Sequence, residues 1–428
     1  MPRKLPSLLL LRCRNADSRT SSRTSRDAGR SGVAVTFLRW TGLRAACHRG
    51  YVLTSSLYFV IHDHLTAAPL LLLGTIMSLT LLLSDIPAGA WSDAFSRKWP
   101  LVIGHGFLAA GMIMTGLVTA YPLVLVTQVL WALGWACSIG ADVAWLTDGL
   151  DQPGRIDRVL AAGARRDLAG GAVGMIAFGV LARAAGLETA VVAAGAAMAL
   201  VGLYVAVRFA EDNFVRAPGR RWTAPAAVFG RGLRLARRDR EILLVFAATM
   251  IINAASMTSR LFPLQLIDLG FPGDPVLWYT GLGILASVVG MAALRLVEAR
   301  IEGAGVARRA YALACVIGVI GLVVLARAPS ALIGCAGVLL VSGIAYNVTR
   351  AVSEIWVNRR TTSDVRATVH SFLSQAESVG EILGGFALAV LARAAGGPAA
   401  LLAAAALIAV TAVLVGRSRT DRAGRPMN

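Results

Sequence analysis

The sequence predicts an all-α polytopic membrane protein with about twelve transmembrane helices arranged in two six-helix halves. Hydrophobic residues make up 56% of its 428 residues and charged residues only 15%, which is too apolar for a soluble domain of this length. The apolar residues fall in runs of roughly 18–25, the length that a helix needs to cross ~30 Å of hydrocarbon. The alternating pattern of β-barrel strands does not recur, so helices are the expected spanning elements.

Twelve apolar spans follow one another along the chain. The first six are expected at Leu43–Ile61, Leu70–Ala90, Leu101–Ala120, Leu123–Leu146, Val159–Ala182 and Ala190–Val207. The second six are expected at Ile242–Phe262, Val276–Val297, Ala310–Ala326, Ala331–Val357, Ala367–Ala392 and Ala399–Val415. A polar, arginine-rich linker separates the two sets and divides the chain into halves of comparable length.

The formal net charge of +18 follows the expected membrane topology. Basic residues gather between alternate spans, for example at Arg97 and Lys98 and from Arg216 to Arg240, whereas the intervening turns carry almost none. This positive-inside pattern predicts a bacterial inner-membrane protein with both termini in the cytoplasm. Membrane topology accounts for the positive charge, so we expect no nucleic-acid binding. We therefore expect a cytoplasmic tail (1–40, disordered over 1–31), an N-terminal half (41–209), a cytoplasmic linker (210–240), a C-terminal half (241–416) and a cytoplasmic tail (417–428).

The two halves resemble each other in sequence. The heptapeptide Val-Leu-Ala-Arg-Ala-Ala-Gly occurs at 180–186 and again at 390–396, where it closes the fifth and the eleventh span. At the same offset, two glycine pairs match: Gly170 and Gly174 in the first half, and Gly380 and Gly384 in the second. These positions are the ones that a six-plus-six duplication requires.

Charged residues are distributed unevenly among the spans. The third, sixth, ninth and twelfth spans carry no Asp, Glu, Arg or Lys in their interiors, whereas the fifth, tenth and eleventh carry several. A charge in hydrocarbon costs roughly 2.5–3.5 kcal/mol on insertion scales, so charged side chains should face the protein interior. Every third helix is therefore expected to face lipid.

A motif stands between the second and third spans, with the sequence Gly-Ala-Trp-Ser-Asp-Ala-Phe-Ser-Arg-Lys. It resembles the major facilitator signature G-x-x-x-D-R-x-G-R-[RK], with Ala94 and Ser96 in place of the usual arginine and glycine. The matching residues are Gly89, Asp93, Arg97 and Lys98. Over Leu43–Val415, the chain thus resembles a bacterial permease of the major facilitator superfamily. The resemblance implies a gating loop in which Asp93 contacts the other half; the alternative is a simple helix-end carboxylate beside positive-inside residues.

The same resemblance implies that the first, fourth, seventh and tenth helices line a central cavity. Each has a one-sided polar face at helical spacing. The candidate cavity residues are Tyr58, Trp131, Trp135, Ser138, Asn253, Asn347 and Arg350. Aromatic rings beside Asp142 would hold a flat lipophilic or cationic substrate, although packing between helices explains the two tryptophans equally well.

The eleventh span carries the main candidates for proton coupling. His370, Ser374, Glu377 and Glu381 recur on one helical face, and helical rise places Glu377 near mid-membrane. The candidates are Glu377, Glu381, His370 and Asp142. A static salt-bridge network, for example with Arg350, is the alternative.

The sequence contains no catalytic machinery that we recognise. The only lysines are Lys4 and Lys98, and neither lies in a phosphate-binding Gly-Lys-Ser/Thr motif. A Gly-x-Ser-x-Gly hydrolase elbow is also missing. We expect no enzyme activity, no cofactor and no metal site.

These patterns favour a monomeric secondary transporter that works by alternating access in the lipid bilayer. Proton-coupled export of a lipophilic small molecule or drug is the first hypothesis, although the fifth span lacks the Gly-Pro pair of the antiporter signature. Proton-linked uptake of a metabolite is the second. A lipid flippase or a non-transporting membrane sensor on the same fold is the third.

Overall fold

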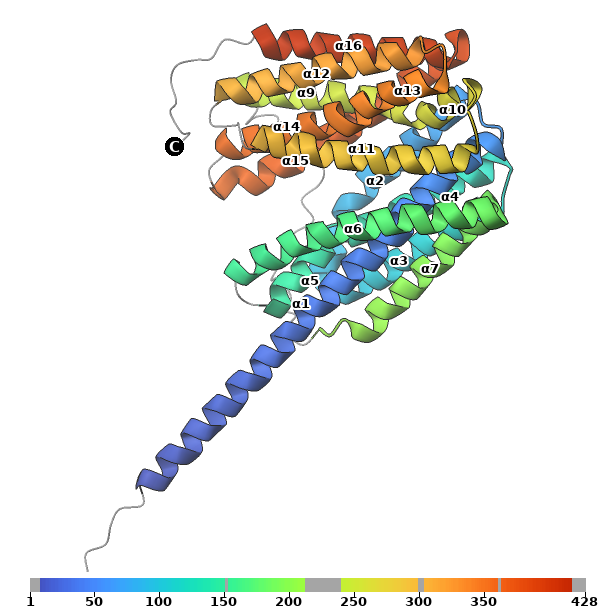
Figure 1. Ribbon diagram of the computed structural model, residues 1–428. Coiled ribbons are helices and arrows are strands. Elements are labelled where there is room, and N and C mark those ends of the chain that lie inside the picture. Colours follow the sequence, from blue (N-terminus) through green and yellow to red (C-terminus); the bar gives the residue numbers. More distant parts are fainter. Residues whose placement is uncertain (1–7, 151–152, 212–239, 299–303, 361–362, 418–428) are drawn as a thin grey trace, which may run out of the picture.

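The computed structural model describes residues 8–150, 153–211, 240–298, 304–360 and 363–417 (Figure 1). The helices of the N-terminal half are α1 (Leu8–Ile61), α2 (Ala67–Phe95), α3 (Lys98–Thr115), α4 (Tyr121–Ser138), α5 (Ala141–Leu150), α6 (Pro153–Ala185) and α7 (Leu187–Arg208). Those of the C-terminal half are α9 (Arg240–Ser256), η1 (Met257–Leu261), α10 (Phe262–Asp268), α11 (Pro275–Glu298), α12 (Ala304–Ala326), α13 (Ala331–Val338), η2 (Leu339–Ala345), α14 (Tyr346–Arg360), α15 (Ser363–Ala395) and α16 (Gly397–Arg417).

These elements form twelve membrane helices, as the sequence predicted. Ten spans within the described residues are long and apolar enough to cross a membrane; among them are the composite spans Tyr121–Leu150, Glu241–Asp268 and Ala331–Asn358. The other two membrane helices are α1 and α3. The mean hydropathy of these two helices is lower, because α1 contains several arginines and α3 contains Lys98 and His105. Both pack inside the N-terminal half, against α6 and α7 respectively.

The packing of the two halves repeats the duplication seen in the sequence. In the N-terminal half α6 packs on α1, and in the C-terminal half α15 packs on α9. The matched glycines make both contacts possible, because a Cβ atom at any of them would overlap the backbone of the partner helix. The contacts are Gly170 on Gly42, Gly174 on Ala46, Gly380 on Met250, and Gly384 on Ala254.

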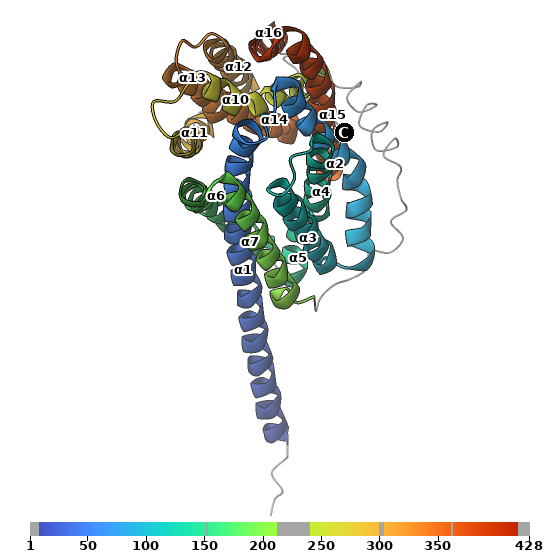
Figure 2. The same ribbon diagram turned by 90° about the vertical axis from the view of Figure 1, so that its right-hand side faces the viewer.

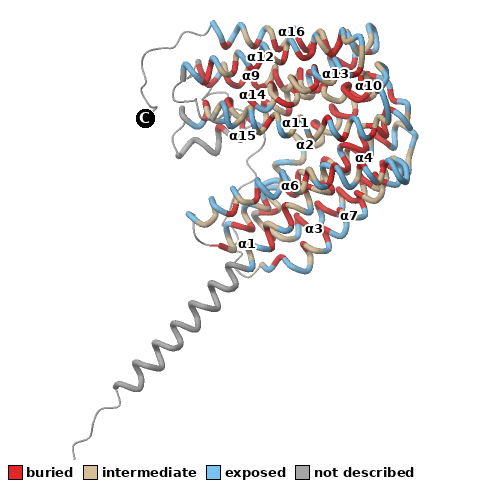
Figure 3. The backbone as a smooth tube through the Cα atoms, in the orientation of Figure 1, coloured by how far each residue is buried: buried red, intermediate tan, exposed pale blue. Residues whose placement is uncertain are grey.

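Helices at the periphery of the bundle expose apolar side chains. Figure 2 shows α7 and α16 at the outside of their halves, and Figure 3 shows exposed residues along their lengths. Large apolar side chains are exposed on both; Leu200 of α7 is 67% exposed and Val410 of α16 is 52% exposed. Such surfaces suit the hydrocarbon of a bilayer, but they occur on other helices too, such as Leu83 of α2 at 67% exposed, so the lipid-facing role of every third helix stays a prediction.

Three of the membrane spans are interrupted. The fourth breaks between α4 and α5, where Gly140 has a φ of +80°. The seventh contains the 3₁₀ turn η1, and the tenth contains the π-helical segment η2. Interrupted helices are typical of transporter binding regions, because the altered turns aim backbone and side-chain groups into a cavity.

The two halves meet at one end of the molecule and diverge toward the other (Figure 1). We call the end that carries the α2–α3 turn, with Arg97 and Lys98, the basic end. The opposite end carries the α1–α2, α6–α7 and α10–α11 turns. Here Arg183 of the first half pairs with Asp274 of the second, with 2.7 Å between Nε and Oδ2.

The start of the first helix differs from the sequence-based prediction. Helix α1 begins at Leu8, not near Leu43, so it includes much of the segment that we expected to be disordered. Its buried face starts well before the apolar run, with Phe37 and Trp40 in the core. A hydropathy run underestimates such a helix because arginines alternate with its buried residues. Most of the predicted linker lies outside the described residues.

Candidate functional site

A cavity of about 630 Å³ lies between the two halves. Its described walls come from α1, α2, α4 and α6 on one side and from the C-terminal half, chiefly η1, α11, η2 and α15, on the other. None of the described wall residues belongs to α3, α7, α12 or α16. A volume of this size suits a small organic molecule.

The walls combine apolar, flexible side chains with scattered hydroxyl groups. Four methionines line the cavity, namely Met77, Met175, Met257 and Met291. Methionine is unbranched and polarizable, so it adapts to ligands of different shapes. Serines from both halves, among them Ser55 and Ser287, add weak polar contacts.

The strongest polar feature of the cavity joins the two halves. The Ser78 hydroxyl on α2 donates a hydrogen bond to Oε2 of Glu381 on α15, at 2.7 Å. Arg260 of η1 lies close enough to Glu381 for their charges to interact, and Glu381 also interacts with Arg350. One carboxylate thus contacts the N-terminal half and faces cations of the C-terminal half.

Arg260 occupies a space that the sequence of α2 leaves open. A Cβ atom at Gly74 would meet the Nε and Cδ atoms of Arg260, so only glycine allows the side chain to lie there. Within the described part of the chain, its guanidinium donates to one hydrogen-bond acceptor, the Sδ atom of Met77 at 3.2 Å. A thioether is a weak acceptor, so most of the five N–H groups are available to a ligand.

A stack of aromatic rings forms the wall on the N-terminal side. The His48 ring lies against Trp131 and Trp135, with centroid distances of 5.5 and 4.9 Å, and the two indoles are stacked at 5.6 Å. Both Nδ1 of His48 and Nε1 of Trp131 are buried without a hydrogen-bond partner among the described residues. His48 and Trp131 both line the cavity, so their rings form part of its wall.

Below the stack, Arg44 closes the aromatic column. Its guanidinium lies over the Trp40 and Trp135 rings, at 4.3 and 5.3 Å from their centroids. It also pairs with Asp142 of α5 at 3.9 Å. The four α1 residues Trp40, Arg44, His48 and Tyr51 are spaced by three or four positions, so they share one face of the helix.

Comparison with known proteins identifies the family of this fold. A sequence model described as Major Facilitator Superfamily matches residues 49–384. The chain belongs to the major facilitator superfamily. A comparison with curated protein sequences finds no match.

Solved structures of other transporters share the fold of this facilitator. The nucleoside transporter NupG is 12% identical, with a TM-score of 0.72, over 90% of this chain and 100% of its own. A POT family transporter in complex with a thioalcohol-conjugated peptide is 11% identical, with a TM-score of 0.66, over 90% and 95%. A bacterial homologue of the human lysosomal transporter Spinster, inward-facing and unoccupied, is 15% identical, with a TM-score of 0.65, over 91% and 95%. At these identities the likeness establishes the fold alone.

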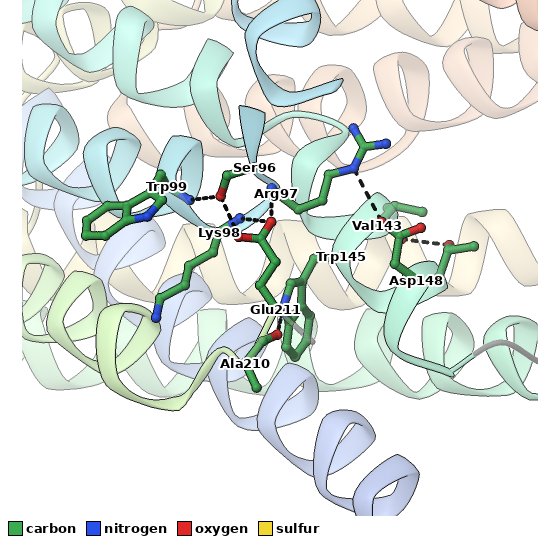
Figure 4. Close-up of polar contacts among 10 residues, drawn as sticks. Ser96, Arg97, Lys98, Trp99, Val143, Trp145, Asp148, Ala210 and Glu211 are labelled. Carbon is green, nitrogen blue, oxygen red and sulfur yellow. Dashed lines mark hydrogen bonds and ion pairs between the residues drawn. The ribbon is translucent and has the colours of Figure 1, made fainter. Parts of the chain in front are cut away.

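The gating loop of the facilitator is held within the N-terminal half (Figure 4). Glu211, just after α7, accepts the Ser96 hydroxyl at 2.7 Å and the backbone N–H groups of Arg97 and Lys98. The Arg97 side chain pairs with Asp148 of α5 at 3.4 Å. The expected contact of Asp93 with the other half concerns a side chain outside the described residues. Gly89 has open space around it.

The structure places the other candidate residues either on the cavity wall or away from it. Trp131, Asn347 and Glu381 lie on the cavity wall, and Trp135 stacks on Trp131. Three others bond or pack elsewhere: Tyr58 stacks on His62, Ser138 donates to the Gly134 carbonyl, and Asn253 donates to the Thr249 carbonyl.

The charged candidates are also separated. Asp142 is engaged with Arg44, and Arg350 forms an exposed pair with Glu354 at 3.5 Å. Glu377 is not among the described residues that line the cavity, and its charge interacts with Arg350 and Glu381. The side chain of His370 lies outside the described residues. Of the four proton-coupling candidates, only Glu381 is thus seen on the wall of the cavity.

Several wall residues were not among the candidates. His48 lies one turn before Tyr51 on the same helical face, so helical spacing is the signal that could have identified it. The eighth span, α11, supplies a large part of the wall but has few polar residues to mark it. Arg260 was visible as a charge in an apolar span, and its partner Glu381 could be found only in the folded structure.

Proposed function

We propose that this facilitator is a proton-coupled secondary transporter that moves a lipophilic small organic molecule by alternating access. Glu381 carries the coupling proton. The observation that supports this role most directly is the hydrogen bond from Ser78 to Glu381, because it joins the two halves at the cavity.

Alternating access requires the contacts between the halves to break and reform. A charged Glu381 accepts the Ser78 hydroxyl and balances Arg260, which favours the arrangement in which α2 and α15 are close. A proton on Glu381 weakens both interactions, so the halves separate more easily. The protonation state of one carboxylate is therefore linked to the conformation of the whole protein.

The chemistry of the walls supports a lipophilic substrate. Methionines, leucines and aromatic rings make up much of the apolar part of the cavity, and methionines and aromatic rings bind flat or irregular carbon skeletons without demanding one shape. The positive-inside pattern assigns the basic end to the cytoplasm, so the cavity of this conformer faces the cytoplasm.

The direction of transport depends on the charge of the substrate. A substrate that competes with the proton for Glu381 moves in the direction opposite to the proton and is exported. A substrate that binds together with the proton moves with it and is imported. The sequence alone favoured export, with uptake as the alternative.

The proposal can be tested in efflux-deficient bacteria that express the protein. Accumulation of a panel of dyes, antibiotics and small aromatic metabolites would be measured with and without a protonophore. We expect changed accumulation of at least one compound, abolished by protonophore and by Glu381→Gln. Glu188→Gln, an exposed position in the first turn of α7, is the matched control.

The outcomes separate the competing functions. If Glu381→Gln leaves uphill transport and its pH dependence intact, Glu381 does not couple. In sealed liposomes a membrane sensor binds the compound, seen as a change in tryptophan fluorescence, without moving it across. That result would contradict transport altogether.

A further inference from the structure

Arg260 is the most unusual charge of the cavity. It lies in the 3₁₀ interruption of the seventh span, and helical rise places it ~12 Å from the opposite end of that span. Its one described hydrogen bond is to a methionine sulfur. A cation held in an apolar membrane bundle is costly, so its persistence there calls for an anionic partner.

The charges on the wall show that Glu381 is only a part-time partner. Among the described wall residues, Arg49 and Arg260 are basic and Glu381 is the single acid. Glu381 already accepts the Ser78 hydroxyl and also faces Arg350. The formal charge of the described wall is thus positive, with two guanidinium groups against one carboxylate.

We propose that the substrate is a small organic anion, such as a carboxylate or phosphate on an apolar body, which binds Arg260 in place of Glu381. Protonation of Glu381 releases Arg260 for this anion, so proton and anion are bound together and are transported in the same direction. This inference rests on the proposed function and specifies its substrate class.

A charge balance explains why the two would move together. Without substrate, the Arg260–Glu381 pair contributes one cation and one carboxylate; with substrate, the same place holds Arg260, the bound anion and a neutral Glu381, while Arg49 and Arg350 keep their charges in both states. Both states have the same net charge. A site with only the proton, or only the anion, leaves one charge uncompensated, which disfavours closure in a low-dielectric bundle. Tight coupling of one proton to each monovalent anion follows.

The groups around Glu381 fit this exchange. Arg260 faces it from η1, Arg350 from α14 and Ser78 from α2, while Glu377 lies on the same helix, α15. Tyr51 of α1 lies near Arg260 and is bonded to Thr115 at 3.0 Å. With the proton gradient directed inward, co-transport of this kind means import. The export direction that the sequence favoured is therefore replaced by uptake in this proposal.

The test compares anions with neutral molecules of the same shape. Purified full-length protein is heated with 2-naphthoate, 4-phenylbutyrate or hexanoate, and in parallel with the primary amide of each, at pH 6 and pH 8. All three carboxylates are ionised at both pH values. The rise in melting temperature with ligand concentration yields a dissociation constant for each compound.

We expect at least one carboxylate to bind roughly tenfold more tightly than its amide at pH 6, with the advantage much reduced at pH 8. Arg260→Gln should abolish the preference, and Arg260→Lys should retain part of it. Gly74→Ala should weaken it by displacing the guanidinium without changing any charge. Arg309→Gln, exposed on α12 and outside the cavity, should have no effect.

Glu381→Gln separates this inference from the proposed function. It should keep the anion preference at both pH values, because Arg260 is then always free. An equal affinity for amides and carboxylates, or a preference that survives Arg260→Gln, would overturn the anion proposal even if Glu381 couples protons. Loss of pH-dependent transport in Glu381→Gln tests the coupling role of Glu381 and not the anion preference of Arg260.

Discussion

At the scale of single residues, the column formed by Trp40, Arg44 and Trp135 shows how a charge is accommodated inside a membrane bundle. The Arg44 guanidinium lies between two aromatic faces and pairs with Asp142. Both charged side chains are about one-sixth exposed, so water contributes little to their solvation. This arrangement favours a structural role for Asp142, where the sequence also allowed proton coupling.

Asp142→Asn should therefore lower stability by up to ~3 kcal/mol, because it leaves Arg44 buried without its partner. The double change Arg44→Gln with Asp142→Asn should recover most of the loss, as a double-mutant cycle in thermal unfolding would show. If Asp142→Asn leaves stability unchanged but removes the pH dependence of transport, Asp142 couples protons and the structural role is wrong.

At the scale of elements, the glycine contacts of α6 and α15 determine how closely each half packs. Gly174 touches the backbone of Ala46, and Gly384 touches the backbone of Ala254. Since the partner in each case is main chain, it cannot move aside as the end of a flexible side chain would. The two halves share this feature because they share the glycine pattern.

Gly174→Ala and Gly384→Ala should each cost roughly 1–3 kcal/mol through overpacking. Thermal unfolding in detergent would measure the loss. Gly106→Ala on α3 is the control, since a Cβ atom there meets open space and alanine favours the helix. Equal effects at all three positions would show that the close contacts do not limit stability.

The gating loop is a second element with a testable contact. Glu211→Ala removes the acceptor of the Ser96 hydroxyl and of two backbone N–H groups. We expect faster hydrogen exchange over residues 96–99, whereas Glu211→Gln, which keeps an acceptor oxygen, should have a smaller effect. Unchanged exchange in both variants would mean that Arg97 and its pairing with Asp148 hold the loop without Glu211.

At the scale of the whole molecule, the two halves are apart at the basic end and in contact at the end that carries the α6–α7 and α10–α11 turns. Arg183 and Asp274 pair across the halves there, and a Cβ atom at Gly179 of α6 would touch Thr280 of α11. Arg183 is 60% exposed, so solvent screens the pair and it contributes at most ~1 kcal/mol. Such a bond can bias a conformational equilibrium without locking it.

Arg183→Ala should shift the population toward the other conformer by up to about fivefold. The readout is labelling of a cysteine introduced at Thr280, in a cysteine-free background, by a maleimide that does not cross membranes. Exchange of the charges, Arg183→Asp with Asp274→Arg, should restore the original labelling rate. A rate that is the same in all variants would exclude the pair as a gate.

The sequence by itself determined the class of the protein, its twelve helices and its duplication. Each of these follows from hydropathy, charge and repeated residues, which are properties of separate segments. Only the tertiary structure decided which polar residues meet. Ser78, Arg260 and Glu381 lie on three different helices, and their contact depends on how the two halves pack. The same holds for Arg44 and Asp142, because spacing along one helix predicts a shared face and says nothing about the partner across the bundle.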